Sequence, residues 1–186
     1  VFSADVDDFW RPNDSATAVV DGKLSITAYL DGIAGAWDDY RARGGVEIAA
    51  IDRFCHHQPF TKMAVKAHRS LGAHTGAELG IELLEESTAY NRRIGNSYTA
   101  SLYLALAALL DGDDDLAGRR IGMFSYGSGS VSEFFTLVVS PEYREHSRAG
   151  ATRELLEART PVDLSRYRAL HAAAAALGSR DDVEVA

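Results

Sequence analysis

The sequence contains a single cysteine, Cys55, and therefore forms no internal disulfide bond. It has no apolar run of about 18 residues and no segment patterned like a secretory signal, which argues against a membrane or secreted protein. Positive charge is also scarce, because 19 Lys and Arg residues face 27 Asp and Glu residues, for a formal net charge of −8. Nucleic-acid binding requires a clustered basic surface. The sequence therefore predicts a cytoplasmic protein that binds neither membranes nor nucleic acids.

Hydrophobic residues, by contrast, make up 46% of the 186 positions. This content suits one globular domain with a sizeable core, or half of a larger fold. The chain starts at Val1 and passes directly into the aromatic, turn-forming stretch DDFWRPND at residues 7–14. We interpret this start as that of a second half whose upstream half is absent from the chain.

The spacing of apolar residues predicts helices that alternate with strands. Predicted helices fall within residues 24–45, 60–71, 78–93, 97–110 and 141–178, and predicted strands within residues 51–55, 121–125 and 133–139. Ser25 is expected to cap the first helix, and the Gly44–Gly45 pair to end it. Residues 97–110 are apolar on almost every side, as expected of a helix buried between two layers. The predicted architecture is a layered α/β fold.

The stretch FCHHQPFTKM, residues 54–63, lies at a predicted junction of a strand and a helix. His57 stands at the end of the strand, where an imidazole can face a cleft and titrate near neutral pH, although a lone histidine is more often structural. Lys62, Lys66 and Arg69 share one face of the helix that follows. Such cationic strips usually face solvent, but beside a histidine this strip can hold a ligand phosphate.

Other sites suggested by the same residues fit the spacing less well. The cysteine and histidines at positions 55–57 and 68 are zinc-ligand types, but adjacent strand residues point to opposite faces and no second ligand pair has metal-site spacing. We therefore expect no metal. Cys55 and His57 are two positions apart and permit a thiolate–imidazole pair, whereas a small buried cysteine is the commoner arrangement.

The Gly-Ser-Gly sequence at residues 127–129 can bring backbone N–H groups close to an anionic or polarised oxygen. The surrounding SYGSG is not a nucleophile elbow, because Tyr126 occupies the place of the first glycine. A phosphate-binding loop of the G-x-x-x-x-G-K-[ST] type is absent from the sequence as well. The turn is therefore a candidate oxyanion site rather than a nucleophile or nucleoside triphosphate site.

Five ordered motifs resemble signatures of the 3-hydroxy-3-methylglutaryl-CoA synthase family. They are DFWRP at residues 8–12, VDGKLSI at 20–26, HQPFTKM at 57–63, RIGNSYTASLYLAL at 93–106 and RIGMFSYGSGSVSEFF at 120–135. The resemblance is strong over residues 6–146 and weaker beyond them. It implies a thiolase-like αβαβα fold, of which residues 1–186 form the C-terminal half. It also implies an acyltransferase that adds an acetyl group to the β-keto carbon of an acetoacetyl or β-ketoacyl thioester.

The resemblance further implies roles for individual residues. His57 matches the family's catalytic histidine, which hydrogen-bonds the acceptor's carbonyl oxygen and acts as an acid and base. Asn96 matches the asparagine that orients the acetoacetyl thioester. Ser128 and Gly129 match the loop that lines the acyl pocket, where an N–H can stabilise a developing oxyanion.

Three more positions carry over from the family. Lys62 and Lys66 match positions near the pantetheine and nucleotide phosphates, in agreement with the cationic strip. Asp8 matches an aspartate that supports the site from behind. His56 departs from the family pattern, which has an aromatic residue there, and leaves open whether His56 or His57 faces the cleft.

The family's nucleophilic cysteine and glutamate base belong to its upstream half, and Cys55 does not replace them. The resemblance therefore implies activity only together with an N-terminal half, a homodimer of the complete unit, and no cofactor beyond the acyl-CoA or phosphopantetheine-bound substrates. The wording of the motifs favours the polyketide β-branching branch, in which an acyl carrier protein presents the acyl groups. The alternatives are the mevalonate-pathway branch, which uses free CoA thioesters, and a non-catalytic subunit that binds CoA or a carrier protein.

Overall fold

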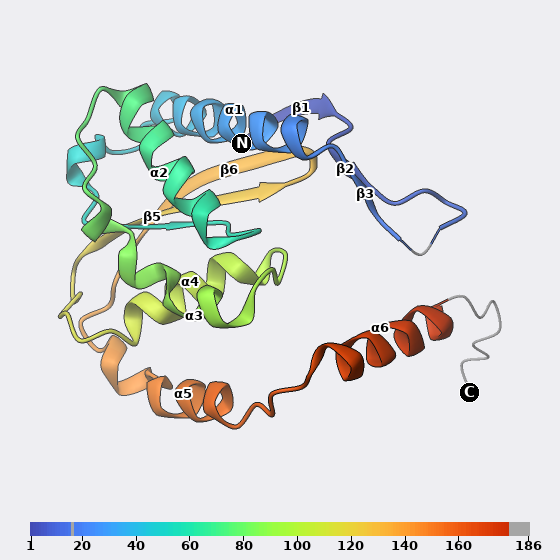
Figure 1. Cartoon of the computed structure of the whole chain (residues 1–186). Helices are drawn as coiled ribbons and strands as arrows, with labels where there is room; N and C mark the ends of the chain where they lie inside the picture. Colours follow the sequence, from blue (N-terminus) through green and yellow to red (C-terminus); the bar gives the residue numbers. More distant parts are fainter. Residues whose placement is uncertain (16, 179–186) are drawn as a thin grey trace, which may run out of the picture.

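The computed structural model describes residues 1–15 and 17–178, and its centre is a four-stranded sheet in the order β1-β6-β5-β4 (Figure 1). The sheet strands are β1 (Phe2–Val6), β4 (Arg53–His56), β5 (Arg120–Gly127) and β6 (Gly129–Val138), and β2 (Phe9–Trp10) and β3 (Val19–Val20) form a separate hairpin. β6 runs antiparallel to both of its neighbours, whereas β4 runs parallel to β5. The hairpin of β5 and β6 is longer than predicted, because its cross-strand pairs continue to Gly127 and Val131.

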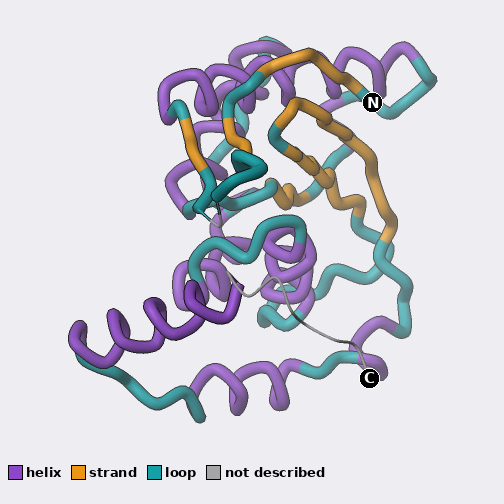
Figure 2. Tube along the Cα trace, turned by 90° about the vertical axis from the view of Figure 1, so that its right-hand side faces the viewer, coloured by secondary structure: helices purple, strands orange, loops and turns teal. Residues whose placement is uncertain are grey.

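Helices cover both faces of this sheet, and the view turned by 90° shows the strands between them (Figure 2). α1 (Gly22–Ala42) and α2 (Thr61–Thr75) pack on one face. α4 (Ala100–Leu110) packs on the other. The predicted layered α/β architecture is therefore confirmed. Tyr103 of α4 is exposed, so part of this helix surface is left uncovered by the described residues.

The pleat of the strands assigns alternate residues to opposite faces of the sheet. In β4, Phe54 belongs to the core under α1 and α2, whereas Cys55 belongs to the core under α4. β5 alternates in the same way, with Phe124 on the first face and Met123 on the second. Both strands are largely buried because both faces of the sheet are covered.

α1 begins earlier than predicted, because Asp21 and not Ser25 caps it. Asp21 Oδ1 accepts hydrogen bonds from the backbone N–H groups of Lys23 at 3.1 Å and Leu24 at 3.0 Å. A carboxylate both satisfies these free N–H groups and lies at the positive end of the helix dipole. Ser25 therefore lies within the first turn, where its side chain lines a cavity described below.

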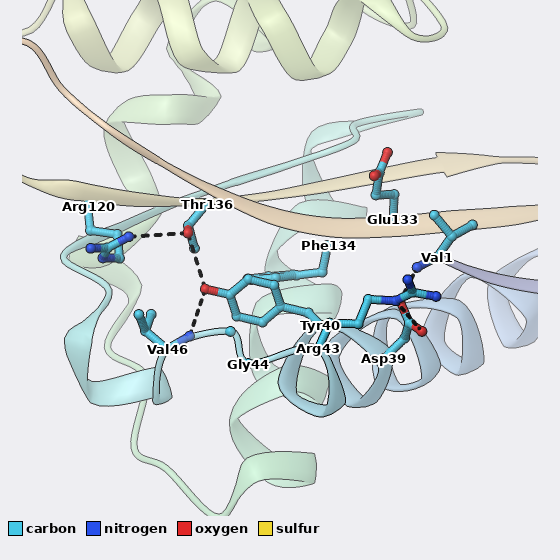
Figure 3. Close-up of a pocket in the computed structure, with 11 residues that line it drawn as sticks. Val1, Asp39, Tyr40, Arg43, Gly44, Val46, Arg120, Glu133, Phe134 and Thr136 are labelled. Atoms are coloured by element: carbon cyan, nitrogen blue, oxygen red, sulfur yellow. Dashed lines mark hydrogen bonds and ion pairs between the residues drawn. The ribbon is translucent and has the colours of Figure 1, made fainter.

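Tyr40 ties the C-terminal end of α1 to the sheet. Its hydroxyl lies 3.1 Å from Thr136 Oγ1 of β6 and accepts a hydrogen bond from the Val46 N–H at 3.0 Å (Figure 3). The chain then passes directly beneath the ring, where a Cβ on Gly45 would collide with it. The helix accordingly ends at Ala42, close to the predicted glycine pair.

The predicted helix over residues 78–93 is wrong for most of its length. Two 3-10 turns, Ile81–Leu83 and Glu85–Thr88, precede a short helix, α3 (Ala89–Ile94). The Ser87 hydroxyl donates to the backbone carbonyl three residues earlier at 2.7 Å. Bonds of this kind compete with the regular helical pattern of the backbone, which explains the tighter turns.

The predicted helical region 141–178 is divided into several elements. They are a 3-10 turn at Tyr143–His146, α5 (Ala149–Glu157) and α6 (Leu164–Gly178). Pro161 separates the two helices, because proline cannot donate a backbone hydrogen bond and disfavours helical geometry in the residue before it. α6 projects away from the rest of the chain (Figure 1). Among the described helices, none combines the length and apolar character needed to cross a bilayer.

Candidate active site

A cavity of about 540 Å³ opens at the end of the sheet, where the chain leaves β4. Its apolar wall includes Phe9, Val20, Ile26, Pro59, Phe60 and Met63. Its polar groups come from Ser25, His57, Asn96, Thr99, Tyr126 and Ser128. A largely apolar wall with a few converging polar groups is typical of sites that bind organic molecules.

His57 reaches this cavity because the backbone around it is fixed on two sides. Its N–H donates to Phe124 O at 2.8 Å, and its carbonyl oxygen accepts the Tyr29 hydroxyl at 2.6 Å. The imidazole itself is 8% exposed, and its Nδ1 lies 3.0 Å from Ser101 Oγ in the first turn of α4. The ring is thus held in one orientation at the edge of the cavity.

The side chain of His56 points to the face of the sheet covered by α2, opposite to that of His57, and does not line the cavity. It is completely buried, with its Nε2 3.4 Å from His68 Nδ1, and His68 Nε2 in turn lies 3.0 Å from Gly80 O. Burial lowers the pKa of His56 well below its usual value, and the neighbouring His68 lowers it further. Of the two adjacent histidines, His57 is therefore the one that faces the cleft.

Cys55 packs in the core under α4 together with Leu102 and Ala105, and has no exposed surface. Burial raises the pKa of its thiol, so the reactive thiolate is disfavoured. Cys55 is also absent from the cavity wall. The structure thus favours the packed cysteine over the thiolate–imidazole pair. Of the histidines that suggested zinc, His56 and His68 lie together in the core, whereas His57 lines the cavity.

Asn96 enters the cavity from the loop between α3 and α4. Its Oδ1 accepts the backbone N–H of Tyr98 at 2.9 Å, a local bond that fixes the amide. Tyr98 itself has a φ of 52°, an unusual value for a residue with a bulky side chain, and its ring is 65% exposed at the cavity. Nδ2 of Asn96 has no hydrogen-bond partner among the residues that the structure describes, so it is available to donate to a ligand.

Asp8 holds the turn between β5 and β6 from behind. Its buried carboxylate accepts the Tyr126 hydroxyl at 2.9 Å and the Gly129 N–H at 3.1 Å. Burial, with a further contribution from the Asp8 carboxylate, raises the pKa of Tyr126 to about 12. Of the two predicted turn residues, Ser128 lines the cavity, whereas the Gly129 N–H is already used by Asp8.

Lys62 and Lys66 lie on the exposed side of α2 and not in the cavity wall. Two of their neighbours in sequence, Phe60 and Met63, do line the cavity. Arg69 is exposed on the same helix. The cationic strip is therefore a surface feature beside the site.

Burial lowers the pKa of His57 to about 4, so its imidazole is neutral at pH 7. The prediction that His57 titrates near neutrality is therefore wrong. The reason is tertiary, because α1, α4 and β5 together remove the ring from water. A neutral imidazole can still donate one ring hydrogen or accept one.

Sequence reasoning missed Ser101 and Tyr29 as partners of His57. Ser101 stands in an apolar helix, where a small polar residue gives only a weak signal, and Tyr29 follows the apolar spacing of α1. Both contact His57 only because segments 28 and 44 residues away in sequence meet in the fold.

A second hollow, of about 470 Å³, lies at the C-terminal end of α1 (Figure 3). Its charged lining residues have opposite signs, with Asp39 paired to Arg43. Arg120 and Thr136 line it from the sheet, and Arg120 Nη1 donates to Thr136 Oγ1 at 3.4 Å. These groups bond to one another rather than converge on a ligand, so the first cavity is the candidate site.

Comparison with known proteins identifies similar sequences. A family model described as the C-terminal part of hydroxymethylglutaryl-coenzyme A synthase matches residues 74–171. A hydroxymethylglutaryl-CoA synthase of Enterococcus faecalis is 40% identical over a match of length 176 that covers 92% of this chain and 46% of that protein. The polyketide biosynthesis 3-hydroxy-3-methylglutaryl-ACP synthase PksG of Bacillus subtilis (strain 168) is 30% identical over 178 residues, covering 91% of this chain and 42% of PksG. The chain thus spans about half the length of the curated relatives it matches.

Solved structures give the same result for the fold. MvaS in complex with 3-hydroxy-3-methylglutaryl coenzyme A matches with a TM-score of 0.82 at 36% identity, over 91% of this chain and 48% of that one. The HMG synthase of the curacin biosynthetic pathway, in complex with acetyl donor-ACP, matches with a TM-score of 0.83 at 32% identity, over 91% of this chain and 43% of that one. The predicted thiolase-like α/β fold is thereby confirmed.

Proposed function

The chain belongs to the hydroxymethylglutaryl-CoA synthase family, and we propose that it supplies the C-terminal half of an acyltransferase that joins an acetyl group to the β-keto carbon of an acetoacetyl or β-ketoacyl thioester. The observation that carries this proposal is the meeting of His57, Asn96 and Ser128 at one cavity. These three residues come from three separate segments, the end of β4, the loop before α4 and the β5–β6 turn. A purely structural role for any of them would not require all three to face the same space.

In the proposed reaction, His57 works on the ketone of the acceptor. The acetyl group's methyl carbon, deprotonated by a base, attacks the ketone carbon and forms the new C–C bond. The ketone's π electrons move to oxygen, the His57 ring N–H hydrogen-bonds that oxygen, and the proton removed from the methyl carbon balances the proton that the oxygen gains. A neutral buried imidazole suits this step, because its ring N–H can donate a hydrogen bond to the developing oxyanion without a charge on the ring in an apolar site.

Asn96 and Ser128 serve the thioester end of the acceptor. The Nδ2 group of Asn96 donates to the thioester carbonyl oxygen, and Ser128, which lines the same cavity, supplies an N–H that stabilises negative charge on oxygen. Asp8 does not touch the substrate in this scheme. It fixes the turn through Tyr126 and Gly129, so that Ser128 keeps its place.

The acetyl group must be held by a nucleophilic cysteine and deprotonated by a glutamate, and we assign both to an N-terminal half. Cys55 is buried and away from the cavity, which supports this assignment. The chain by itself is then inactive in condensation. We also expect the complete unit to form a homodimer.

Coenzyme A and acyl carrier proteins present their acyl groups on the same phosphopantetheine arm. The apolar wall of the cavity suits this arm, and Lys62 and Lys66 are exposed nearby for the phosphates. The choice between the two carriers is therefore made by the surface outside the cavity. The motif wording favours the carrier protein, whereas the higher identity to the Enterococcus enzyme favours free CoA.

The experiment is a condensation assay on the chain co-expressed with the N-terminal half of the Enterococcus faecalis relative. Acetyl-CoA and acetoacetyl-CoA are mixed with the complex, and the released thiol is followed by its reaction with a chromogenic disulfide. We expect His57→Ala to slow the reaction by at least about 100-fold, the usual contribution of an acid–base group. The matched control is His74→Ala, which changes a histidine of α2 that bonds Asp38 and does not line the cavity.

Condensation at the normal rate by the His57→Ala complex would overturn the proposed function. Binding of acetoacetyl-CoA with no condensation by the wild-type complex would instead identify a non-catalytic binding subunit. The same assay with acetyl and acetoacetyl groups on a carrier protein compares the two substrates side by side. A clear preference for free CoA would exclude the β-branching assignment.

A further inference from the structure

A buried hydroxyl contacts the imidazole at the centre of the site. Ser101 has no exposed surface, and its Oγ lies 3.0 Å from His57 Nδ1. No sequence motif indicated this contact, because 44 residues separate the two side chains along the chain. The contact matters because a neutral imidazole has one nitrogen that donates and one that accepts, and the partner of Nδ1 decides which is which.

The neighbouring backbone fixes the direction of this hydrogen bond. Ser101 Oγ accepts the backbone N–H of Gln58 at 2.9 Å, and an N–H can only donate. If Nδ1 also donated to Oγ, the hydroxyl hydrogen would be left in a buried position with no acceptor among the described residues. Leaving a buried donor unsatisfied is unfavourable, so the hydroxyl donates to Nδ1.

The opposite nitrogen then carries the ring hydrogen. Burial keeps the imidazole neutral at pH 7 by lowering its pKa to about 4, so only one nitrogen is protonated. Nε2 makes no hydrogen bond to any residue within the described ranges, and His57 lines the cavity. The hydrogen on Nε2 is therefore free to meet a ligand.

The parts of this arrangement are rigid. The His57 backbone is bonded to Phe124 and Tyr29 on its two sides. The Ser101 carbonyl accepts a hydrogen bond from Asn91 Nδ2 at 2.8 Å, which ties the first turn of α4 to α3. The serine hydroxyl and the imidazole are thus held in fixed relation by elements on both sides of the contact.

We propose that Ser101 is a positioning residue that holds His57 in the tautomer with hydrogen on Nε2, so that the cavity receives an N–H donor rather than a lone pair. The use of that donor rests on the proposed function, in which it would hydrogen-bond the acceptor's ketone oxygen. The other tautomer would direct a lone pair at the same oxygen and repel it. The tautomer itself is a property of the chain and can be measured without any substrate.

The test is ¹⁵N NMR of the purified chain, labelled with ¹⁵N-histidine and kept near neutral pH. Protonated and unprotonated imidazole nitrogens differ widely in chemical shift, and couplings to the ring C–H groups distinguish Nδ1 from Nε2. The chain has 6 histidines, and His57→Gln identifies the signals of His57 by their loss. We expect hydrogen on Nε2 and none on Nδ1. Hydrogen on Nδ1 in the wild-type chain would overturn the proposal.

Two serine variants separate a specific effect from a general one. Ser101→Ala removes the donor to Nδ1, and we expect the tautomer ratio to move by about tenfold toward hydrogen on Nδ1. Ser87→Ala removes an equally buried hydroxyl that donates to Leu84 O and does not contact His57, and it should leave the ratio unchanged.

An unchanged tautomer in a Ser101→Ala chain with a native amide spectrum would also overturn the proposal. If that variant does not fold, Ser101→Cys replaces it with a weaker donor of similar size, and the wild-type measurement is decisive by itself. Failure of the proposed function is seen separately, as normal condensation in the His57→Ala complex. The NMR result is independent of condensation, so the two failures can be told apart.

Discussion

At the scale of single residues, one position along β4 separates a core histidine from a cavity histidine. His56 is the last residue of the strand, and its side chain points toward His68 and α2. His57 follows it and points toward Ser101 and the cavity. Successive side chains alternate across a strand, so a shift of one residue would exchange the two roles.

The depressed pKa of His57 predicts that the chain loses stability in acid. Because this pKa falls from 6.5 to about 4 on folding, the unfolded chain holds more protons between these values. The free energy of unfolding therefore decreases as pH falls through this range. Replacing His57 with Gln should abolish about 2 kcal/mol of the loss between about pH 7.5 and about pH 5.

Urea unfolding of both chains at both pH values measures this difference. His57→Asn should show the same reduction, because either amide removes the titrating group. Equal pH dependence in the wild-type and variant chains would mean that the imidazole is not buried in its neutral form.

At the scale of elements, the segment that follows α2 packs closely against the last turn of that helix. The helix ends where Gly76 adopts a φ of 69°, and the Ala77 N–H then donates to Gly72 O at 3.0 Å. This return brings the Ala77 carbonyl oxygen over Gly72, where an added Cβ would lie 2.9 Å from it. The absence of a side chain at Gly72 therefore allows the segment after α2 to fold back on the helix.

Gly72→Ala is expected to destabilise the chain by about 1–2 kcal/mol. Alanine favours a helix over glycine by about 1 kcal/mol, but overpacking against backbone costs about 1–3 kcal/mol, so the collision outweighs the gain. The matched control is Gly150→Ala in α5, where an added Cβ has open space and should leave stability equal or higher. Thermal unfolding of the two variants checks the difference, and a neutral Gly72→Ala would contradict the close approach.

At the scale of the whole molecule, the chain consists of a layered body and an extended C-terminal arm (Figure 1). α5 belongs to the body, since Leu156 is buried in a cluster with Tyr90 and Ala108. α6 does not, since its side chains from 164 to 174 are exposed, including those of Leu164 and Tyr167. The arm therefore contributes little to the stability of the body.

Truncation after Pro161 should leave the free energy of unfolding within about 0.5 kcal/mol of the full chain, as for most changes at exposed positions. Truncation before Arg148, which also removes α5, should cost about 2–4 kcal/mol through loss of the Leu156 contacts. Urea unfolding of the two truncated chains tests this contrast. A large loss on removing α6 alone would show that the arm packs on the body.

Much of the architecture and the main site residues can be predicted from the sequence. Apolar spacing indicates α1, α2, α4 and the strands β4, β5 and β6 because each signal lies within a few neighbouring residues, whereas β1 (Phe2–Val6) was not predicted. His57, Asn96 and Ser128 were identified by short motifs for the same reason, and the fold brings them to one cavity. The segment 78–93 was mispredicted because side-chain bonds to its own backbone outweighed a helical pattern.

Only the tertiary structure decided which groups at the site are free to act. In the folded chain, His56 is buried beside His68, and the Gly129 N–H donates to Asp8. The Ser101 hydroxyl contacts the His57 imidazole. The tertiary structure also lowered the pKa of His57, which no local pattern indicated. The sequence by itself determined the local periodicity and the motifs, because these depend on near neighbours. Hydrogen-bond partners and burial depend on segments far apart along the chain, and so they exist only once the layers have packed.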